Sequence, residues 1–260
     1  MARRMIIPPT RFPNAVAASY SRAMAQMIQQ MHSITYAALL KSIAEEVRIY
    51  QNESYRADGP LDIIWNALKF AKDRVAAQIF NPAKVVEVAS QFVSRVNFFN
   101  KRMVNNQFDG RVRGFDPTER EPWINDYMKV SVKENVSYIT KLQDDYAARV
   151  ESIVMQGVKN GQKLTDMAQE ISKAANISYQ RAKFIARDQT GSITGQLTAK
   201  RHQDAGFKRF KWSTSHDERV RPEHRGYDGK IYPYDQPPAG KLPGVPFNCR
   251  CVAYPVDDEE

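Results

Sequence analysis

The chain has 260 residues, of which 42% are hydrophobic and 26% are charged, a composition typical of globular proteins. Lysine and arginine outnumber aspartate and glutamate by 38 to 29, which gives a net charge of +9 at pH 7. This modest excess, together with 10% aromatic residues, argues against a disordered chain and permits an acidic partner such as nucleic acid without requiring one.

No apolar run approaches the roughly 18 to 20 residues that span a bilayer, so we expect no membrane partner. The first nine residues contain two arginines but no apolar core before Pro8 and Pro9, which does not resemble a signal peptide. The sequence therefore predicts a protein that is made and used without passing through a secretory route.

Apolar residues recur every three or four positions over the first two-thirds of the chain, and this spacing predicts helices. A long helix is expected from Asn14 to about Tyr50, with Met24, Met27 and Met31 on its apolar face, where methionine is more often adaptable core than an interaction groove. The segment Asp58–Pro60 ends this helix and begins a second one. Asparagine 81 and Pro82 supply the N-cap and the first residue of a third helix.

Glycines and prolines between about Asn106 and Glu121 predict a loop or hinge. The next helix is expected from Trp123 to about Asn160, and at 1.5 Å per residue it would be roughly 50 Å long, which favours an elongated molecule. Thr165 and Ser178 then cap two shorter helices separated by a turn at residues 175–177. This pair resembles a helix-turn-helix DNA reader, although two helices with a short turn are also the commonest packing unit of helical proteins.

From Phe207 to Trp212 apolar and basic residues alternate, which is typical of a strand. Turn-forming residues dominate after it, with further strand positions at Ile231, Val252 and Tyr254. The sequence therefore predicts a mainly α fold with a small C-terminal α+β domain, built of long helices and elongated. Its expected divisions are an N-terminal helical region (1–120), a long helix and helical pair (121–206) and a small β-containing domain with an acidic tail (207–260).

Cys249 and Cys251 are the two cysteines of the chain, and they lie too close in sequence for an unstrained internal disulfide. Together with His224 and either His216 or Asp217 they are candidate ligands of a structural zinc ion, which would help a loop-rich segment of about fifty residues to fold. The Cys-x-Cys spacing is tighter than the usual Cys-x-x-Cys. The alternative is that two small thiols fill a core while His224 hydrogen-bonds a turn.

Basic residues interleaved with aromatic ones between positions 200 and 230 suit contact with nucleic-acid phosphates. The candidate residues are Lys208, Arg209, Lys211, Arg219 and Arg221. Lysines along an exposed strand also prevent edge-to-edge aggregation, which is the alternative interpretation. A metal-dependent nuclease is a further alternative, but no obvious nucleophile or phosphate-binding glycine loop accompanies the histidines, so we expect no enzymatic activity.

Three blocks in fixed order resemble the minor head proteins similar to protein F of phage Mu, the head-morphogenesis family of tailed phages, over about residues 161–256. The blocks are Ala182–Gly191, the stretch from Ala205 through Asp217–His224 to Gly229, and Pro237–Val256 with Asn248–Cys251 inside it. We expect Arg187 and Asp188 to lock the preceding helix onto the C-terminal domain, and Trp212, Asp217 and Asn248 to have structural roles in the motif.

The resemblance implies a structural minor head protein that is bound to the portal inside the capsid and assists procapsid assembly and DNA packaging or ejection. Its implied partners are the portal protein, other capsid-interior or scaffolding proteins and packaged double-stranded DNA. The implied location is the portal vertex of the virion, and the host cytoplasm during assembly. The alternative function is that of a free nucleic-acid-binding protein.

Overall fold

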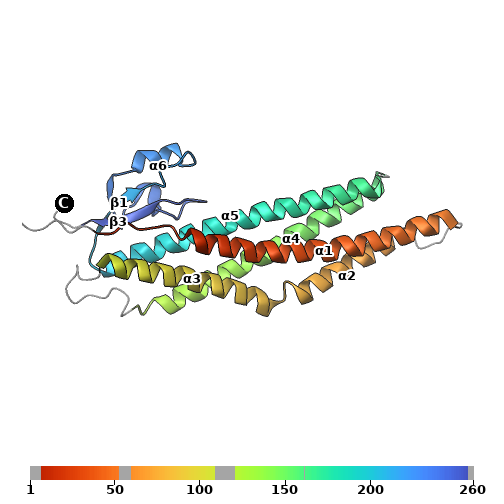
Figure 1. The fold of residues 1–260 in the computed structure, drawn as a ribbon, viewed down its shortest axis with the longest axis horizontal. Helices are drawn as coiled ribbons and strands as arrows, with labels where there is room; N and C mark the ends of the chain where they lie inside the picture. The colour runs from red at the N-terminus through yellow and green to blue at the C-terminus, as the bar shows by residue number, and fades with distance from the viewer. Residues whose placement is uncertain (1–6, 53–59, 109–120, 161, 257–260) are drawn as a thin grey trace, which may run out of the picture. The chain divides into compact units, whose positions relative to one another are not determined.

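The structure is a computed structural model of the chain and describes residues 7–52, 60–108, 121–160 and 162–256. Five long helices come first: α1 (Asn14–Asn52), α2 (Pro60–Gln78), α3 (Pro82–Phe108), α4 (Ile124–Lys159) and α5 (Leu164–Asp204) (Figure 1). A short strand β1 (Arg209–Ser213), helix α6 (Pro222–Tyr227), strand β2 (Ile231–Pro233), a 3-10 turn (Pro238–Gly240) and strand β3 (Val252–Val256) follow. This confirms a mainly α chain with a small C-terminal α+β region.

The first four helices begin and end close to the positions predicted from the sequence. The predicted N-cap of α3 is present, because the backbone N–H of Lys84 donates to Asn81 Oδ1 at 2.9 Å. Most of the expected loop between Asn106 and Glu121, and the acidic tail, lie outside the described residues. None of the described helices combines the length and apolarity needed to cross a membrane. The elongated shape inferred from the helix lengths stays a prediction.

The predicted helical pair after residue 164 is wrong, because α5 is one continuous helix from Leu164 to Asp204. The expected turn at residues 175–177 is helical, and the Ser178 hydroxyl donates to the carbonyl of Ala174 at 3.2 Å instead of capping a new helix. Serine tolerates this back-bonding within a helix, and the preceding alanines favour helical backbone. The helix-turn-helix interpretation is therefore also wrong.

The three strands form an antiparallel sheet in the order β2-β1-β3. Phe210 on the central strand lies opposite Tyr232 of β2 and Pro255 of β3, and Trp212 lies opposite Ala253. Phe210 and Trp212 are buried whereas Lys211 between them is exposed, which is the alternation expected of a sheet with one covered face. The strand predicted over residues 207–212 is thereby confirmed.

The chain divides into two compact units that interleave along the sequence. Unit 1 combines Met1–Ser21, Ala89–Asn135 and Phe184–Glu260, and unit 2 combines Arg22–Val88 and Val136–Lys183. The helices α1, α3, α4 and α5 therefore each contribute residues to both units. The division expected from the sequence, with boundaries at residues 120 and 206, consists of three consecutive regions, whereas each compact unit combines segments that are distant in the chain.

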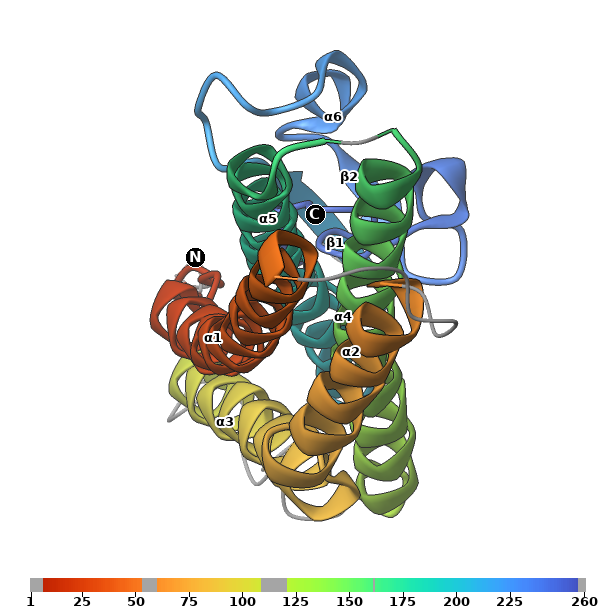
Figure 2. The same ribbon diagram turned by 90° about the vertical axis from the view of Figure 1, so that its right-hand side faces the viewer.

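The core of unit 1 joins the sheet to α3 and α5. Its buried residues are Met103, Val104, Phe108, Ala199, Phe207, Phe210, Trp212, Tyr234, Cys249, Cys251 and Ala253. Figures 1 and 2 show the sheet and α6 beside the C-terminal half of α5. Three short strands bury little apolar surface by themselves, so the small α+β region depends on these helices for its core.

A buried arginine ties three segments of unit 1 together. Arg201 on α5 is fully buried and donates to both carboxylate oxygens of Glu121, at 2.6 and 3.1 Å. It also donates to Asn100 Oδ1 at 2.6 Å and Asn97 Oδ1 at 2.7 Å on α3. Bidentate pairing combined with further hydrogen bonds is what makes a buried guanidinium tolerable.

The described residues of unit 2 form helices and the short turns that connect them. Met24, Met27 and Met31 of α1 are buried, which confirms the core interpretation of the methionine stripe. His32 Nδ1 on the same helix is hydrogen-bonded to Tyr146 Oη of α4 at 2.9 Å. Burial lowers the pKa of His32 and raises that of Tyr146, so both groups are neutral partners at pH 7.

His202 in unit 1 makes stability depend on pH. Gln107 Nε2 donates to the Pro8 carbonyl and to Thr10 Oγ1, so Gln107 Oε1 accepts from His202 Nε2 at 3.0 Å. The Tyr234 hydroxyl then donates to His202 Nδ1 at 2.6 Å. Burial lowers the pKa of His202 to about 3, so the ring is neutral in the fold whereas the unfolded chain protonates it below about pH 6.5.

We expect stability to be greatest above pH 6.5 and to fall as the pH drops toward 3. Between pH 7 and pH 5 the contribution of His202 to the free energy of unfolding falls by about 2 kcal/mol. Urea unfolding at the two pH values should show this loss in the wild-type protein and in a His216→Ala control, but not in His202→Gln. An equal loss in His202→Gln and wild type would contradict the assignment.

Candidate metal centre

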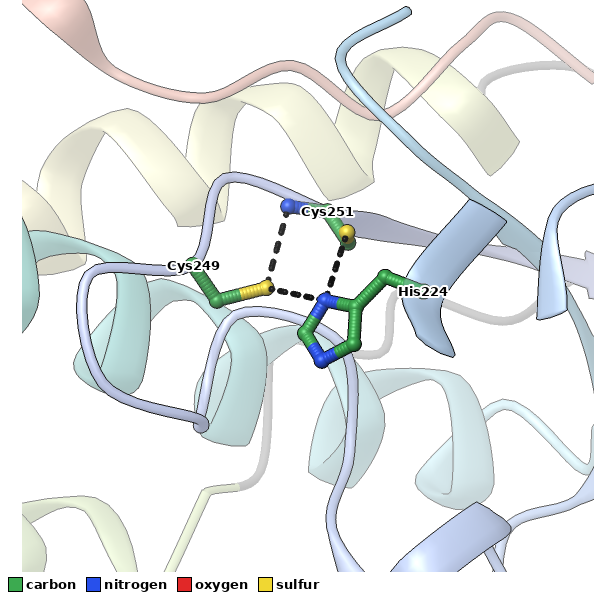
Figure 3. A group of neighbouring side chains, drawn as sticks. All are labelled: His224, Cys249 and Cys251. Carbon is green, nitrogen blue, oxygen red and sulfur yellow. Dashed lines mark hydrogen bonds between the residues drawn. The ribbon is translucent and has the colours of Figure 1, made fainter. Parts of the chain in front are cut away.

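Three potential metal ligands converge in the C-terminal part of unit 1. His224 lies on α6, while Cys249 and Cys251 lie just before β3 (Figure 3). His224 Nδ1 is 3.5 Å from the Sγ atom of Cys249 and 3.5 Å from that of Cys251. The three potential ligand atoms all lie within 4.8 Å of one another, and all three residues are buried. Among the described residues they form the one such cluster of His, Cys, Asp and Glu side chains.

Local sequence fixes the direction of each ligand. Pro222 starts the short helix α6, and the ring of His224 packs edge-on against the Trp212 indole with centroids 5.3 Å apart. Cys249 donates its backbone N–H to the Pro246 carbonyl at 3.0 Å. Asn248 has a positive φ of 55°, a conformation that asparagine tolerates better than most residues. The loop therefore turns just before the cysteines and carries them toward α6.

Asp188 and Arg187, the residues expected to lock α5 onto the C-terminal region, both hydrogen-bond Asn248. Asp188 Oδ1 accepts a hydrogen bond from the backbone N–H of Asn248 at 2.6 Å, and Arg187 donates to Asn248 Oδ1 at 3.5 Å. A Cβ added to Gly191 would lie 2.5 Å from the carbonyl oxygen of Cys249 and 2.9 Å from that of Gly244. Helix α5 thus approaches the cysteine loop closely enough that only glycine fits.

The two thiols have different pKa values. A hydrogen bond with Cys251 lowers the pKa of Cys249 to about 6, and the backbone N–H of Cys251 also donates to Cys249 Sγ at 3.4 Å. The same pairing, together with burial, raises the pKa of Cys251. One thiol of the pair therefore ionises readily while the other keeps its proton.

His216, the fourth ligand expected from the sequence, lies outside the cluster. Its side chain is 68% exposed, and its Nδ1 is 3.5 Å from Asp228 Oδ2. The other expected ligand, Asp217, forms an ion pair with Arg250, which is the main cause that lowers the pKa of the Asp217 carboxyl. Neither residue joins His224 and the cysteines.

A cavity of about 130 Å³ adjoins the cluster. Its lining contains no acidic residue and consists of Arg187, Ser215, Arg219, Val220, Arg221, His224, Asn248, Cys249, Arg250 and Cys251. Burial and the nearby charges of Arg250 and Arg219 lower the pKa of Arg187, whereas Asp217 raises it. Four guanidinium groups crowded around one space make it attractive to an anion.

The five basic residues predicted to contact nucleic acid fall into two groups. Arg219 and Arg221 line the cavity, whereas Arg209 and Lys211 lie on β1 and Lys208 directly precedes that strand. Sequence reasoning missed the contribution of Arg187 and Arg250 to the cavity. Their position inside the motif blocks was the available signal, because Arg250 stands between the two cysteines.

The C-terminal part of unit 1 is therefore a small α+β region that contains a buried His/Cys/Cys cluster and is hydrogen-bonded to the long helix α5. Residues 148–254 match the family described as phage Mu protein F like protein. This match contains the whole cluster and all of α5. It confirms the resemblance to the phage Mu protein F-like family that the sequence motifs predicted.

Three similar proteins illustrate how far the likeness extends. The chain is 36% identical over 175 residues to an uncharacterized protein of Haemophilus influenzae, a match that covers 66% of this chain and 39% of that protein. It is 25% identical over 239 residues to minor head protein GP7 of Bacillus phage SPP1, covering 80% of this chain and 75% of GP7. It is 26% identical over 133 residues to the NAD(+)–arginine ADP-ribosyltransferase EFV of Enterococcus faecalis, covering 45% of this chain and 27% of that protein. No solved structure matches the chain.

We expect Gly191→Ala to destabilise the protein, because the new methyl group meets two backbone carbonyls that cannot move aside cheaply. Overpacking of this kind costs about 1–3 kcal/mol. Gly226→Ala is the control, since nothing lies within 4 Å of its added Cβ, and its effect should stay below about 1 kcal/mol. Urea unfolding measures both, and equal stability of Gly191→Ala and wild type would contradict the close approach.

Proposed function

We propose that this protein is a structural minor head protein of a tailed bacteriophage, which binds the portal inside the capsid and assists procapsid assembly and DNA packaging or ejection. The observation that carries the proposal is the Mu protein F-like segment, together with the likeness to GP7 over 75% of that minor head protein. We infer its location to be the portal vertex of the virion, and the host cytoplasm during assembly.

A structural role fits the named relatives better than catalysis does. The likeness to the ADP-ribosyltransferase extends over 27% of that enzyme, so it gives no reason to transfer the activity to this chain. Of the two histidines considered for a nuclease, His216 is exposed, whereas His224 is buried in the cluster with the two cysteines.

Portal binding can be tested with the portal protein encoded by the same phage. The two proteins, coexpressed without other virion components, should elute together in size-exclusion chromatography after nuclease treatment. We assign the contact to the family-matched segment, so Phe247→Ala, which truncates a side chain that is 68% exposed in that segment, should weaken binding at least tenfold. Large exposed aromatic anchors are typical of interface hot spots.

Phe98→Ala is the matched control, because this phenylalanine is 69% exposed but lies on α3, outside the family-matched segment. It should leave portal binding unchanged. Failure of the wild-type protein to bind the portal would contradict the proposal. Equal loss of binding in the two variants would contradict the assignment to the family-matched segment.

We further propose that the arginine-lined cavity contacts the backbone phosphates of double-stranded DNA. Of the predicted basic residues, Arg219 and Arg221 lie there together with Arg187 and Arg250. Guanidinium groups pair well with phosphate oxygens, and a packaged genome supplies phosphates at high density. Contact of this kind is independent of sequence and depends on salt.

The double variant Arg219→Ala/Arg221→Ala should weaken binding of a random-sequence DNA duplex and reduce the slope of log K against log salt by about 1 to 2. Lys211→Ala is the control, because this exposed lysine lies on β1 and should change neither quantity. Fluorescence anisotropy at several salt concentrations measures both. An equal effect of Lys211→Ala would contradict a specific role for the cavity, and binding of DNA without any binding of the portal would favour a free nucleic-acid-binding protein.

A further inference from the structure

We propose that His224, Cys249 and Cys251 bind one zinc ion through Nδ1 and the two Sγ atoms, with the fourth coordination position open to the arginine-lined cavity. The ligand set differs from the one expected from the sequence, because it excludes His216 and Asp217. It is an inference about the fold of the C-terminal region and does not depend on portal or DNA binding.

The distances match the edges of a zinc tetrahedron. With Zn–S bonds of about 2.3 Å and Zn–N bonds of about 2.0–2.1 Å, tetrahedral angles place a ligand nitrogen and sulfur about 3.5 Å apart. Both Nδ1–Sγ distances are 3.5 Å. Two sulfurs on the same ion would lie about 3.8 Å apart, within the 4.8 Å that separates any two ligand atoms here at most.

Thiol–imidazole hydrogen bonds alone account poorly for this convergence. His224 Nδ1 has one lone pair or one hydrogen to offer, yet it is equally far from both sulfurs. Figure 3 shows the two sulfurs and Nδ1 directed toward one common space. A single cation in that space satisfies all three atoms at once.

The surroundings of the cluster supply a donor and positive charge that suit metal-bound thiolates. The buried Trp212 indole N–H has no hydrogen-bond partner among the described residues. A zinc-bound thiolate is a better acceptor for such a donor than a neutral thiol, and groups of this kind commonly support metal ligands. The four arginines of the cavity add positive potential beside the sulfurs.

The fourth ligand comes from solvent. Among the described residues no further His, Cys, Asp or Glu side chain joins the three, and the cluster lines the cavity of about 130 Å³. The ion would connect α6 to the segment that leads into β3. This cross-link stabilises a region whose three strands are only three to five residues long, because metal binding adds directly to the free energy of folding.

The full-length protein, purified under reducing conditions without chelator, should contain one zinc ion per chain by inductively coupled plasma mass spectrometry. Cys249→Ser, Cys251→Ser and His224→Ala should each lower bound zinc at least tenfold. His216→Ala is the matched control and should keep one zinc per chain, because its side chain lies outside the cluster. Full zinc content in the cysteine variants would overturn the assignment.

Cobalt substitution keeps the test independent of whether the variants fold. Wild-type protein, stripped of metal and reloaded with Co²⁺, should show thiolate-to-cobalt charge-transfer absorption and the visible bands of a tetrahedral ion, and Zn²⁺ should abolish both. Wild-type protein that carries no zinc and gives no charge-transfer band with Co²⁺ would overturn the site. Neither result depends on the portal or DNA experiments.

Discussion

The close approach between α5 and the cysteine loop is the constraint on which the C-terminal region depends. Gly191 and Gly195 allow the carbonyls of residues 243, 244 and 249 to lie against the helix, and Asp188 holds the backbone N–H of Asn248 at 2.6 Å. These contacts determine where Cys249 and Cys251 stand relative to His224. The cluster is therefore a consequence of helix–loop packing, and a metal ion would bind to positions already directed by that packing.

Periodicity in the sequence predicted the helices through α4 and the central strand, because their apolar spacing extends over many residues. It failed at residues 175–177 of α5, where Ser178 was interpreted as a cap although its hydroxyl donates to Ala174 within the helix. A capping residue and a back-bonding serine have the same identity, so local sequence cannot separate them. Helix α6, six residues long, is too short for any period to be visible.

The site was predictable in composition and only partly in geometry. His216 and His224 are eight positions apart and equally suited to bind a metal, yet the turn that follows β1 leaves His216 exposed while α6 buries His224. Two titratable residues of the core were not foreseen. Arg201 and His202 near the end of α5 have the composition of an exposed helix terminus, but partners from Asn97 to Tyr234 bury both. Only the tertiary fold brings such partners together.

The discontinuous make-up of unit 1 has a consequence for synthesis on the ribosome. Thr10 Oγ1 donates to the carbonyl of Ala253 at 2.6 Å across a separation of 243 residues. This hydrogen bond of the N-terminal segment can form only after Ala253 has been synthesised. The last residue of unit 2 is Lys183, so all of unit 2 has been synthesised before any strand of the unit 1 sheet. Nascent chains are therefore expected to expose the apolar faces of α3 and of the end of α5 until β3 has been translated. Apolar surface exposed in this way is what chaperones bind.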